Sequence, residues 1–209
     1  MNIGICGAGN IGSTLGSLWA RAGHRVMLSS RHPGQVEELA REVGPGVSAG
    51  SVEQAAEFGQ VVLMAIPLNG VRDAAARAGD RTGGKLLIDA MNYFPGRDAV
   101  LSGALREFGG PTSAYVQSLF PGTGLVKAFN TIFYQSLRRE AAREGKLMAV
   151  PVAGDDPEAK RMAAMLVADA GFDPCDVGGL DRSVVMEPGG LLWLKELTLE
   201  EMTGLLNTG

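Results

Sequence analysis

A glycine-rich stretch near the start of the chain has the residue types and the spacing that bind a pyrophosphate. Residues 7–12 read GAGNIG and fit the pattern G-x-G-x-x-G, directly after an apolar run and directly before a helical pattern. In such a loop the first glycine permits a tight turn, the second lets the phosphates approach, and the helix N-terminus offers free N–H groups. A glycine-rich turn without a ligand is the alternative. The residues predicted to bind the cofactor here are Gly7, Ala8, Gly9, Asn10, Ile11 and Gly12.

A second stretch, about 20 residues further on, determines which dinucleotide fits. Folds that prefer NAD carry Asp or Glu there to bond the ribose 2′-hydroxyl, whereas this chain reads Ser29-Ser30-Arg31-His32. A carboxylate would repel a 2′-phosphate, but hydroxyls and a guanidinium bind it. We therefore expect NADP(H) as the cofactor, with Ser30 and Arg31 as the main contacts and His32 as a helper. The alternative is that Arg31 is a surface arginine on a turn.

Few side chains are placed for acid–base chemistry. His24 precedes the second predicted strand, so we expect a structural role for it, and His32 belongs to the adenosine end. Tyr134 is followed at the fourth position by Arg138, so the Tyr-x-x-x-Lys pair of short-chain dehydrogenases is absent. Lys127 lies on a strand and could reach the cleft, although a structural role is favoured. No catalytic residue is predicted, which suits direct hydride transfer to a flavin-like ring better than ketone reduction.

The acidic residues and the cysteines also favour structural roles. Asp155–Glu158 is typical of a helix start, with Asp156 as N-cap and Pro157 in the first turn, rather than of a metal site. Cys6 and Cys175 each lie in a short apolar stretch and are predicted to be buried, reduced thiols. We therefore expect no metal, and a reducing, cytoplasmic compartment.

Short apolar runs alternate with helical patterns along the chain. The runs are continuously apolar, which is typical of strands covered on both faces in a parallel sheet. This alternation predicts an α/β fold: a doubly wound, mainly parallel sheet of the Rossmann type with a small C-terminal extension. Residues 1–135 are predicted to form the NADP-binding core, and residues 136–209 to complete the sheet and the acceptor site. Strands are expected at 2–6, 25–29, 47–49, 61–66, 85–90, 125–129, 147–153 and 172–177, and helices at 10–22, 35–43, 51–58, 68–78, 113–119, 131–143 and 157–170.

Two stretches interrupt this alternation. Asn92–Pro111 carries Gly and Pro and is predicted to be irregular, either as a mobile active-site loop or, as we favour, as a long surface connection. Met186–Gly190 breaks the helical tail because proline ends a helix. This corner either folds back over the acceptor site, with Leu191, Leu192 and Trp193 as an apolar wall, or forms a dimer contact or a plain turn. The last two are favoured.

Composition disfavours several classes of partner. Of the 209 residues, 45% are hydrophobic and 20% are charged, which is a globular balance with enough apolar residues for a substantial core. The net charge of −4 disfavours a nucleic-acid or anionic-membrane surface. No apolar run reaches the ~18 residues needed to cross a bilayer. We expect a small-molecule hydride acceptor as the partner, no nucleic acid and no membrane.

Seven motifs run in order through nearly the whole chain. They are GAGNIG at 7–12, SSR at 29–31, AIP at 65–67, DAMN at 89–92, VKAFNT at 126–131, PVAGDD at 151–156 and DVGGLDRS at 176–183. The first is shared by many families, whereas the later ones in this order are more specific. With them the chain resembles the NADPH-dependent F420 reductases, the F420:NADP oxidoreductases, whose domain also forms the reductase part of the membrane metalloreductases called STEAP.

The resemblance implies roles for particular residues. Residues 8–11 would hold the pyrophosphate, and Ser30 with Arg31 the 2′-phosphate. The nicotinamide-ribose side would be lined by Ile66, Pro67 and Leu68. Near the nicotinamide and the acceptor would lie Asn92, Ala128, Asn130 and Thr131. The resemblance also implies F420 as a co-substrate and a homodimer formed through the C-terminal tail.

The two asparagines can also be placed by the fold. Ligands in such sheets bind beyond the carboxyl ends of the strands, and Asn92 and Asn130 each follow a strand directly. Their amides could bind the nicotinamide carboxamide or an acceptor carbonyl, or each could cap a turn.

Two features depart from the family: Gln35 stands where members can carry a lysine for the 2′-phosphate, and MEPGGLLW at 186–193 matches no deazaflavin contact.

The main functional prediction is an NADP-dependent oxidoreductase that transfers hydride between NADP(H) and a flavin-like acceptor such as coenzyme F420. One alternative is an NADPH-dependent reductase of a small carbonyl or imine. Pyrroline carboxylate reductases start with a similar motif but add a long helical domain, for which too little chain remains after Val177. The other alternative is a non-catalytic NADPH-binding sensor module.

Overall fold

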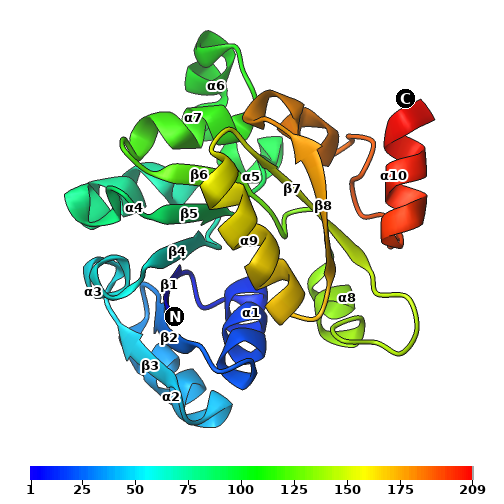
Figure 1. Ribbon diagram of the computed structural model, residues 1–209. Helices are drawn as coiled ribbons and strands as arrows, with labels where there is room; N and C mark the ends of the chain where they lie inside the picture. The colour runs from blue at the N-terminus through cyan, green and yellow to red at the C-terminus, as the bar shows by residue number, and fades with distance from the viewer. Residues whose placement is uncertain (209) are drawn as a thin grey trace.

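The chain folds around an eight-stranded sheet (Figure 1). The structure is a computed structural model that describes residues 1–208, with only the backbone of Pro33. The strands are β1 (Asn2–Cys6), β2 (Arg25–Ser29), β3 (Val47–Gly50), β4 (Val61–Met64), β5 (Leu86–Asp89), β6 (Gly124–Lys127), β7 (Ala149–Gly154) and β8 (Asp173–Gly178). Their spatial order is β3-β2-β1-β4-β5-β6-β7-β8.

Strand direction places a ligand crevice at the centre of this sheet. The first six strands are parallel, and β1 pairs with both β2 and β4. β7 runs antiparallel to β6 and parallel to β8. The predicted doubly wound, mainly parallel α/β fold is confirmed. The winding reverses between β1 and β4, and ligands bind beyond the carboxyl ends of strands at such a point. β7 and β8 continue the same sheet, and the division of the chain at residue 135 stays a prediction.

Helices cover both faces of the sheet. The α-helices are α1 (Asn10–Arg21), α2 (Pro33–Val43), α3 (Val52–Phe58), α4 (Val71–Ala78), α5 (Pro95–Asp98), α6 (Ser102–Phe108), α7 (Thr112–Leu119), α8 (Tyr134–Arg139), α9 (Pro157–Asp169) and α10 (Leu199–Thr208). Short 3-10 helices are η1 (Leu68–Gly70), η2 (Gly79–Thr82), η3 (Ala99–Leu101) and η4 (Leu180–Met186). Buried side chains of α1, α2 and α9 form one core, and those of α3, α4 and α7 form the core on the opposite face. α10 lies beside β8, at the right edge of Figure 1.

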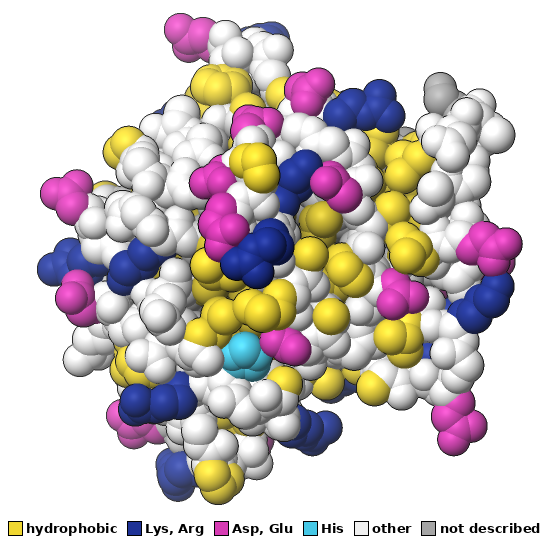
Figure 2. Space-filling model, in the orientation of Figure 1, with side chains coloured by type: hydrophobic (Ala, Val, Ile, Leu, Met, Phe, Trp, Pro, Cys, Tyr) yellow, Lys and Arg dark blue, Asp and Glu magenta, His cyan; other side chains and the backbone are white. Residues whose placement is uncertain are grey.

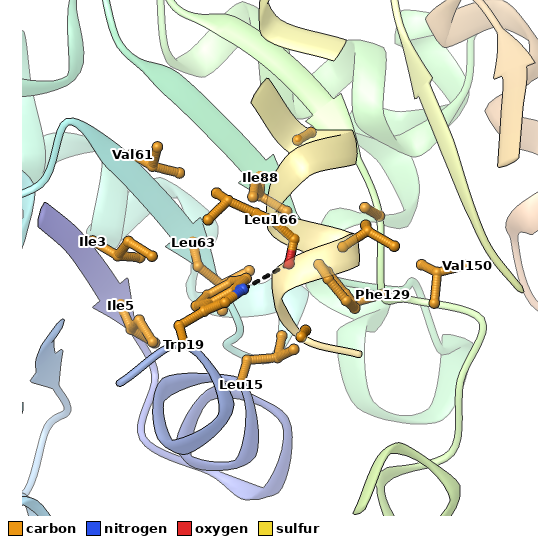
Figure 3. Close-up of a cluster of buried hydrophobic side chains, with 14 of the residues drawn as sticks. Ile3, Ile5, Leu15, Trp19, Val61, Leu63, Ile88, Phe129, Val150 and Leu166 are labelled. Atoms are coloured by element: carbon orange, nitrogen blue, oxygen red, sulfur yellow. Dashed lines mark hydrogen bonds between the residues drawn. The ribbon is translucent and has the colours of Figure 1, made fainter. Parts of the chain in front are cut away.

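Trp19 joins distant parts of the first core. Its side chain is fully buried among Ile3, Leu63 and other aliphatic residues (Figure 3). The indole N–H donates to the carbonyl of Leu166 on α9 at 2.8 Å, and the ring meets Phe129 edge to face with centroids 5.9 Å apart. α1, which follows the glycine-rich loop, is thereby fixed to the segment that follows β6.

Two helix starts are capped by side chains. Ser51 accepts the N–H of Gln54 at 3.2 Å while the Gln54 side chain accepts the N–H of Ser51 at 2.8 Å, which is a capping box at α3. Asp156 accepts the N–H groups of Glu158 and Ala159 at 2.8 and 3.3 Å, so its predicted N-cap role is confirmed.

The structure corrects two predictions about local conformation. Asn92–Pro111 is not irregular, because it holds α5, η3 and α6. Helices this short make too few turns to produce a periodic apolar face that can be read from the sequence. The helix expected at 131–143 is confined to α8, since Phe129 has a left-handed backbone with φ of 63° and a bend at 130–132 follows it.

The remaining sequence-based expectations concern thiols, metals and membranes. Cys6 and Cys175 are free and buried, as predicted, and burial raises the pKa of the Cys6 thiol to about 11. Within residues 1–208, the helices are too short or too polar to span a bilayer. In the same range, His, Cys, Asp and Glu side chains do not gather in threes as metal ligands would. On the face in Figure 2, basic and acidic side chains are interspersed over the surface.

Candidate functional site

The glycine-rich loop leaves β1 and turns into α1 at the winding reversal. Gly7 has φ of 108°, and a Cβ there would lie 2.3 Å from the carbonyl oxygen of Ala65. A Cβ on Gly12 would lie 1.9 Å from the carbonyl oxygen of Gly7, so both glycines are required by the fold. Gly9 differs, because a Cβ there would meet no atom within 4 Å. That open space is where a pyrophosphate can reach the first N–H groups of α1.

A cavity of about 480 Å³ extends from this loop to the end of β2. Its lining includes Gly9, Ser30, Arg31 and His32, so the structure brings together the residues predicted for the pyrophosphate and for the 2′-phosphate. The Ser30 hydroxyl accepts the N–H of His32 at 2.9 Å, which holds the turn. The arginine and histidine side chains are exposed, and a hydroxyl, a guanidinium and an imidazole at one corner form a donor set suited to a phosphate dianion.

A second cavity, of about 600 Å³, continues the first. Both cavities are lined by Gly9, Ala65, Ile66 and Pro67, so they meet beyond the ends of β1 and β4. The second cavity ends in a largely aromatic wall. The aromatic residues of this wall are Phe94, Phe129, Phe133, Tyr134 and Trp193. We call the second cavity the acceptor cavity.

Asn92 and Asn130 bond to each other at the edge of the acceptor cavity. Asn92 Nδ2 donates to the carbonyl of Asn130 at 2.8 Å, and Asn130 Nδ2 donates to Asn92 Oδ1 at 3.0 Å and to the carbonyl of Met186 at 2.8 Å. Both N–H groups of Asn130 are therefore used. Its Oδ1 is buried and accepts no hydrogen bond within residues 1–208. A buried acceptor without a partner is costly, so this atom is suited to receive an N–H from a ligand.

Backbone conformations that are rare outside glycine occur at the same cavity. Phe129 and Leu194 line it and have φ of 63° and 54°. Such conformations cost about 1–3 kcal/mol each and concentrate at functional sites. The Leu194 N–H donates to the carbonyl of Thr131 at 3.1 Å, which fastens the C-terminal segment to the end of β6.

The corner at Met186–Gly190 is held beside this cavity, where the carbonyl of Met186 accepts an N–H of Asn130. The Glu187 carboxylate accepts the N–H of Thr112 at 2.7 Å and so caps α7. A Cβ on Gly190 would lie 2.6 Å from the carbonyl oxygen of Val184, so the turn requires glycine. Trp193 lines the acceptor cavity and meets Phe94 edge to face at 6.1 Å. The predicted apolar wall is thus correct for Trp193, whereas Leu191 and Leu192 pack in a third apolar cluster with residues of β7 and β8. Residues 188–189 form a turn, as favoured from the sequence, and a dimer contact stays a prediction.

Arg97 provides the charge in the lining of the acceptor cavity and is held rigidly. It forms a bidentate pair with the buried Asp98 at 2.9 and 2.8 Å and donates to the carbonyl of Asn92 at 2.7 Å. Asp98 also accepts the N–H groups of Asn69 and Phe94. Burial alone would raise the pKa of the Asp98 carboxyl, but these hydrogen bonds outweigh it and hold the pKa below its usual range.

Some predicted site residues lie behind the cavities. The side chains of Leu68 and Ala128 are fully buried in the two cores and are not part of either lining, so the structure does not place them at the cofactor. Lys127 is also fully buried. It bonds to Asp89 at 3.2 Å and to the carbonyl of Met91 at 3.0 Å, which confirms a structural role. His24 bonds to Asp169 at 2.9 Å, away from both cavities.

Several lining residues were not predicted to be part of the site, and three of them carry polar or charged groups that bear on its chemistry. Arg77 of α4 lies beside Ser30 and Arg31, Tyr134 brings a hydroxyl to the acceptor cavity, and Asp73 lines the first cavity. The missing lysine at Gln35 was a signal that another cation could be needed. Tyr134 could not be identified from the sequence, because Arg138 stands where the tyrosine–lysine pattern requires a lysine.

Comparisons with known proteins show which proteins the chain is similar to. Residues 2–93 match the family model described as NADP oxidoreductase, coenzyme F420-dependent. The metalloreductase STEAP3 of Rattus norvegicus is 28% identical over 178 residues, which are 85% of this chain and 34% of STEAP3. The chain thus spans about a third of the length of that curated relative.

Two solved structures share the fold over most of both chains. A hypothetical protein from Sinorhizobium meliloti superposes with a TM-score of 0.83 at 28% identity, and 95% of each chain is covered. A proposed F420-dependent NADP reductase from Arthrobacter sp. FB24 superposes with a TM-score of 0.68 at 24% identity, covering 86% of each chain. The predicted resemblance is confirmed: residues 2–93 carry a domain that matches the F420-dependent NADP oxidoreductases, a family of NADP-dependent oxidoreductases.

Proposed function

We propose that this protein transfers a hydride between NADP(H) and a flat, flavin-like acceptor such as the deazaflavin F420. The observation that carries the proposal is the continuity of the two cavities. One run of open space leads from Ser30 and Arg31, past Gly9 and Pro67, to the aromatic wall. A dinucleotide with its 2′-phosphate at the first corner would bring its nicotinamide to the acceptor cavity.

The residues present fit that cofactor. Gly9 leaves room for the pyrophosphate, and Ser30 with Arg31 offers donors to the 2′-phosphate. Asn130 Oδ1 can accept an N–H of the nicotinamide carboxamide, while the second N–H of Asn92 can bond its oxygen. Bound there, NADPH supplies the hydride, and the chain positions the two rings and excludes water.

The lining of the acceptor cavity favours a ring over a simple carbonyl. Among the described lining residues, Arg97 is the charged side chain and Tyr134 carries the hydroxyl. The guanidinium is paired with Asp98, so it is poorly suited to donate a proton. Aromatic side chains such as Phe94 and Trp193 offer flat apolar surfaces on which a ring can stack. Hydride transfer between two rings needs orientation and shielding more than an acid.

Tyr134 allows a sharp test of this proposal against carbonyl reduction. NADPH oxidation is followed by absorbance with F420, with FMN and with a panel of ketones and imines, for the wild type and for Tyr134→Phe. We expect turnover with a flavin-like acceptor and a change of less than about twofold in the variant. Loss of a proton donor typically costs about 10²- to 10⁴-fold. Turnover of ketones alone, with a loss of that size in Tyr134→Phe, would establish the carbonyl reductase instead, and tight binding without turnover would establish the sensor module.

Three further expectations stay proposals: a homodimer, a cytoplasmic location, and the division at residue 135 into a cofactor-binding core and an acceptor-completing part. Sedimentation at several protein concentrations tests the first, and fractionation of the source cells tests the second. A chain truncated after residue 135 that still binds NADPH would support the third.

A further inference from the structure

A second guanidinium lies at the corner assigned to the 2′-phosphate. Arg77 of α4 lines the first cavity together with Ser30 and Arg31. It also lines an adjoining hollow of about 350 Å³ with the same two residues and with Ser51. Arg31 and Arg77 are far apart in the sequence, and both cavities bring them together.

The orientation of Arg77 is fixed by Glu53. Its Nε and Nη2 donate to the two carboxylate oxygens of Glu53 at 2.8 and 3.1 Å. The hydrogen bonds from Arg77 and Ser51 lower the pKa of Glu53 to about 2, so the pair is ionised at neutral pH. Nη1 donates to no group in the part of the chain that the structure describes, and about a third of the Arg77 side chain is exposed. A guanidinium held in this way loses little freedom when its open edge binds an anion.

A purely structural ion pair would not need this position. Arg81 forms the comparable link from η2 to Glu57 of α3, at 3.8 Å, and lines neither hollow. Arg77 differs because it lines the corner where Arg31 is otherwise the lone guanidinium. A phosphate dianion beside Glu53 needs more than one cation to offset the carboxylate.

We propose that Arg77 is a second specificity residue for NADPH, binding the 2′-phosphate together with Arg31. This inference rests on the proposed function, since it assumes that NADPH occupies the first cavity. Glu53 acts as the positioning residue of Arg77.

Calorimetric titrations of NADPH and NADH against four proteins test this: the wild type, Arg77→Gln, Arg31→Gln and the matched control Arg81→Gln. We expect Arg77→Gln to weaken NADPH binding by roughly 10- to 100-fold, the range of a charge-assisted hydrogen bond. NADH binding should change by less than about twofold, because NADH has no 2′-phosphate. Arg81→Gln should leave both affinities unchanged within that margin.

The outcomes separate this inference from the proposed function. Equal weakening of NADPH and NADH in Arg77→Gln would mean that Arg77 contacts the adenine, and equal losses in Arg77→Gln and Arg81→Gln would mean a general field effect; either result overturns the inference. A wild type that binds both nucleotides equally overturns the cofactor assignment itself. If Arg77→Gln fails to fold, Arg77→Lys keeps the positive charge but loses the bidentate pair with Glu53. The NADPH affinity of Arg77→Lys should lie between those of the wild type and Arg31→Gln. An affinity equal to that of the wild type would show that the bidentate pair with Glu53 does not contribute to NADPH binding.

Discussion

Within the glycine-rich loop, Gly9 is the position where a substitution should weaken cofactor binding without destabilising the fold. In Gly9→Ala the new methyl group would meet no protein atom within 4 Å, and the backbone, with φ of −75° and ψ of −169°, suits alanine. A compatible Gly→Ala change stabilises by about 0.4–1 kcal/mol through the unfolded chain. Alanine is a poorer N-cap than glycine, by about 0.5–1 kcal/mol. The two effects nearly cancel, so we expect the free energy of unfolding to change by less than about 1 kcal/mol.

NADPH binding should respond very differently. The methyl group would occupy the space through which the pyrophosphate reaches the N–H groups of α1. Losing one charge-assisted hydrogen bond costs about 1.5–3 kcal/mol, which corresponds to roughly 10- to 100-fold in affinity. The assays are urea unfolding without cofactor and a fluorescence titration with NADPH.

Gly12→Ala is the matched comparison, because its methyl group would lie 1.9 Å from the carbonyl oxygen of Gly7 and should destabilise the fold itself. The reasoning is refuted if Gly9→Ala binds NADPH within twofold of the wild type, since the pyrophosphate would then lie elsewhere. A loss of stability in Gly9→Ala as large as that in Gly12→Ala would contradict the open space at Gly9.

Three other predictions concern the acceptor wall, the buried ion pair and pH. Trp193→Ala should raise the KM for the acceptor by roughly tenfold, since stacking on an aromatic ring is worth about 1–3 kcal/mol. Steady-state kinetics measures this KM, and a titration should show an unchanged Kd for NADPH. If the KM for the acceptor and the Kd for NADPH rose by the same factor, Trp193 would not belong to the acceptor site alone. Lys127→Met should destabilise the fold by about 3–5 kcal/mol in urea unfolding, because it leaves the fully buried Asp89 unpaired, and a loss under about 1 kcal/mol would contradict the ion pair. The pKa of Glu53 is lowered from 4.5 to about 2 by Arg77, so its contribution to stability is present above pH 4.5 and is lost as pH falls toward 2. Glu53→Gln should therefore flatten the stability profile in that window, and identical wild-type and variant profiles would show that the pair adds nothing.

Most of the fold could be predicted because parallel strands leave a strong pattern. Continuous apolar runs such as VVLM at 61–64 are buried on both faces, and the observed strands fall close to the predicted ones. The direction of a strand could not be predicted in this way, since an apolar run has the same composition in a parallel and in an antiparallel strand. The antiparallel pairing of β7 with β6 therefore could not be derived from the sequence. The left-handed conformation of Phe129 was also not predictable, because phenylalanine rarely adopts it and the contact of its ring with Trp19 forms only in the tertiary fold.

The site could be predicted in part for a similar reason. Residues on the loops that follow β1 and β2 were found because a motif with a known geometry carries them. Arg77 and Trp193 were missed or only weakly indicated, since each comes from an element whose place relative to the loop is set by the tertiary fold. Leu68 and Ala128 were placed at the cofactor by resemblance, but their side chains point into the cores.

Competition between the two nicotinamide nucleotides for the wild-type protein tests the central claim most directly. The account predicts that NADPH displaces NADH at concentrations at least roughly tenfold below those needed for the reverse, as one charge-assisted hydrogen bond requires, and that the preference shrinks as salt screens the corner at Arg31. Equal displacement, or a preference for NADH, would contradict it.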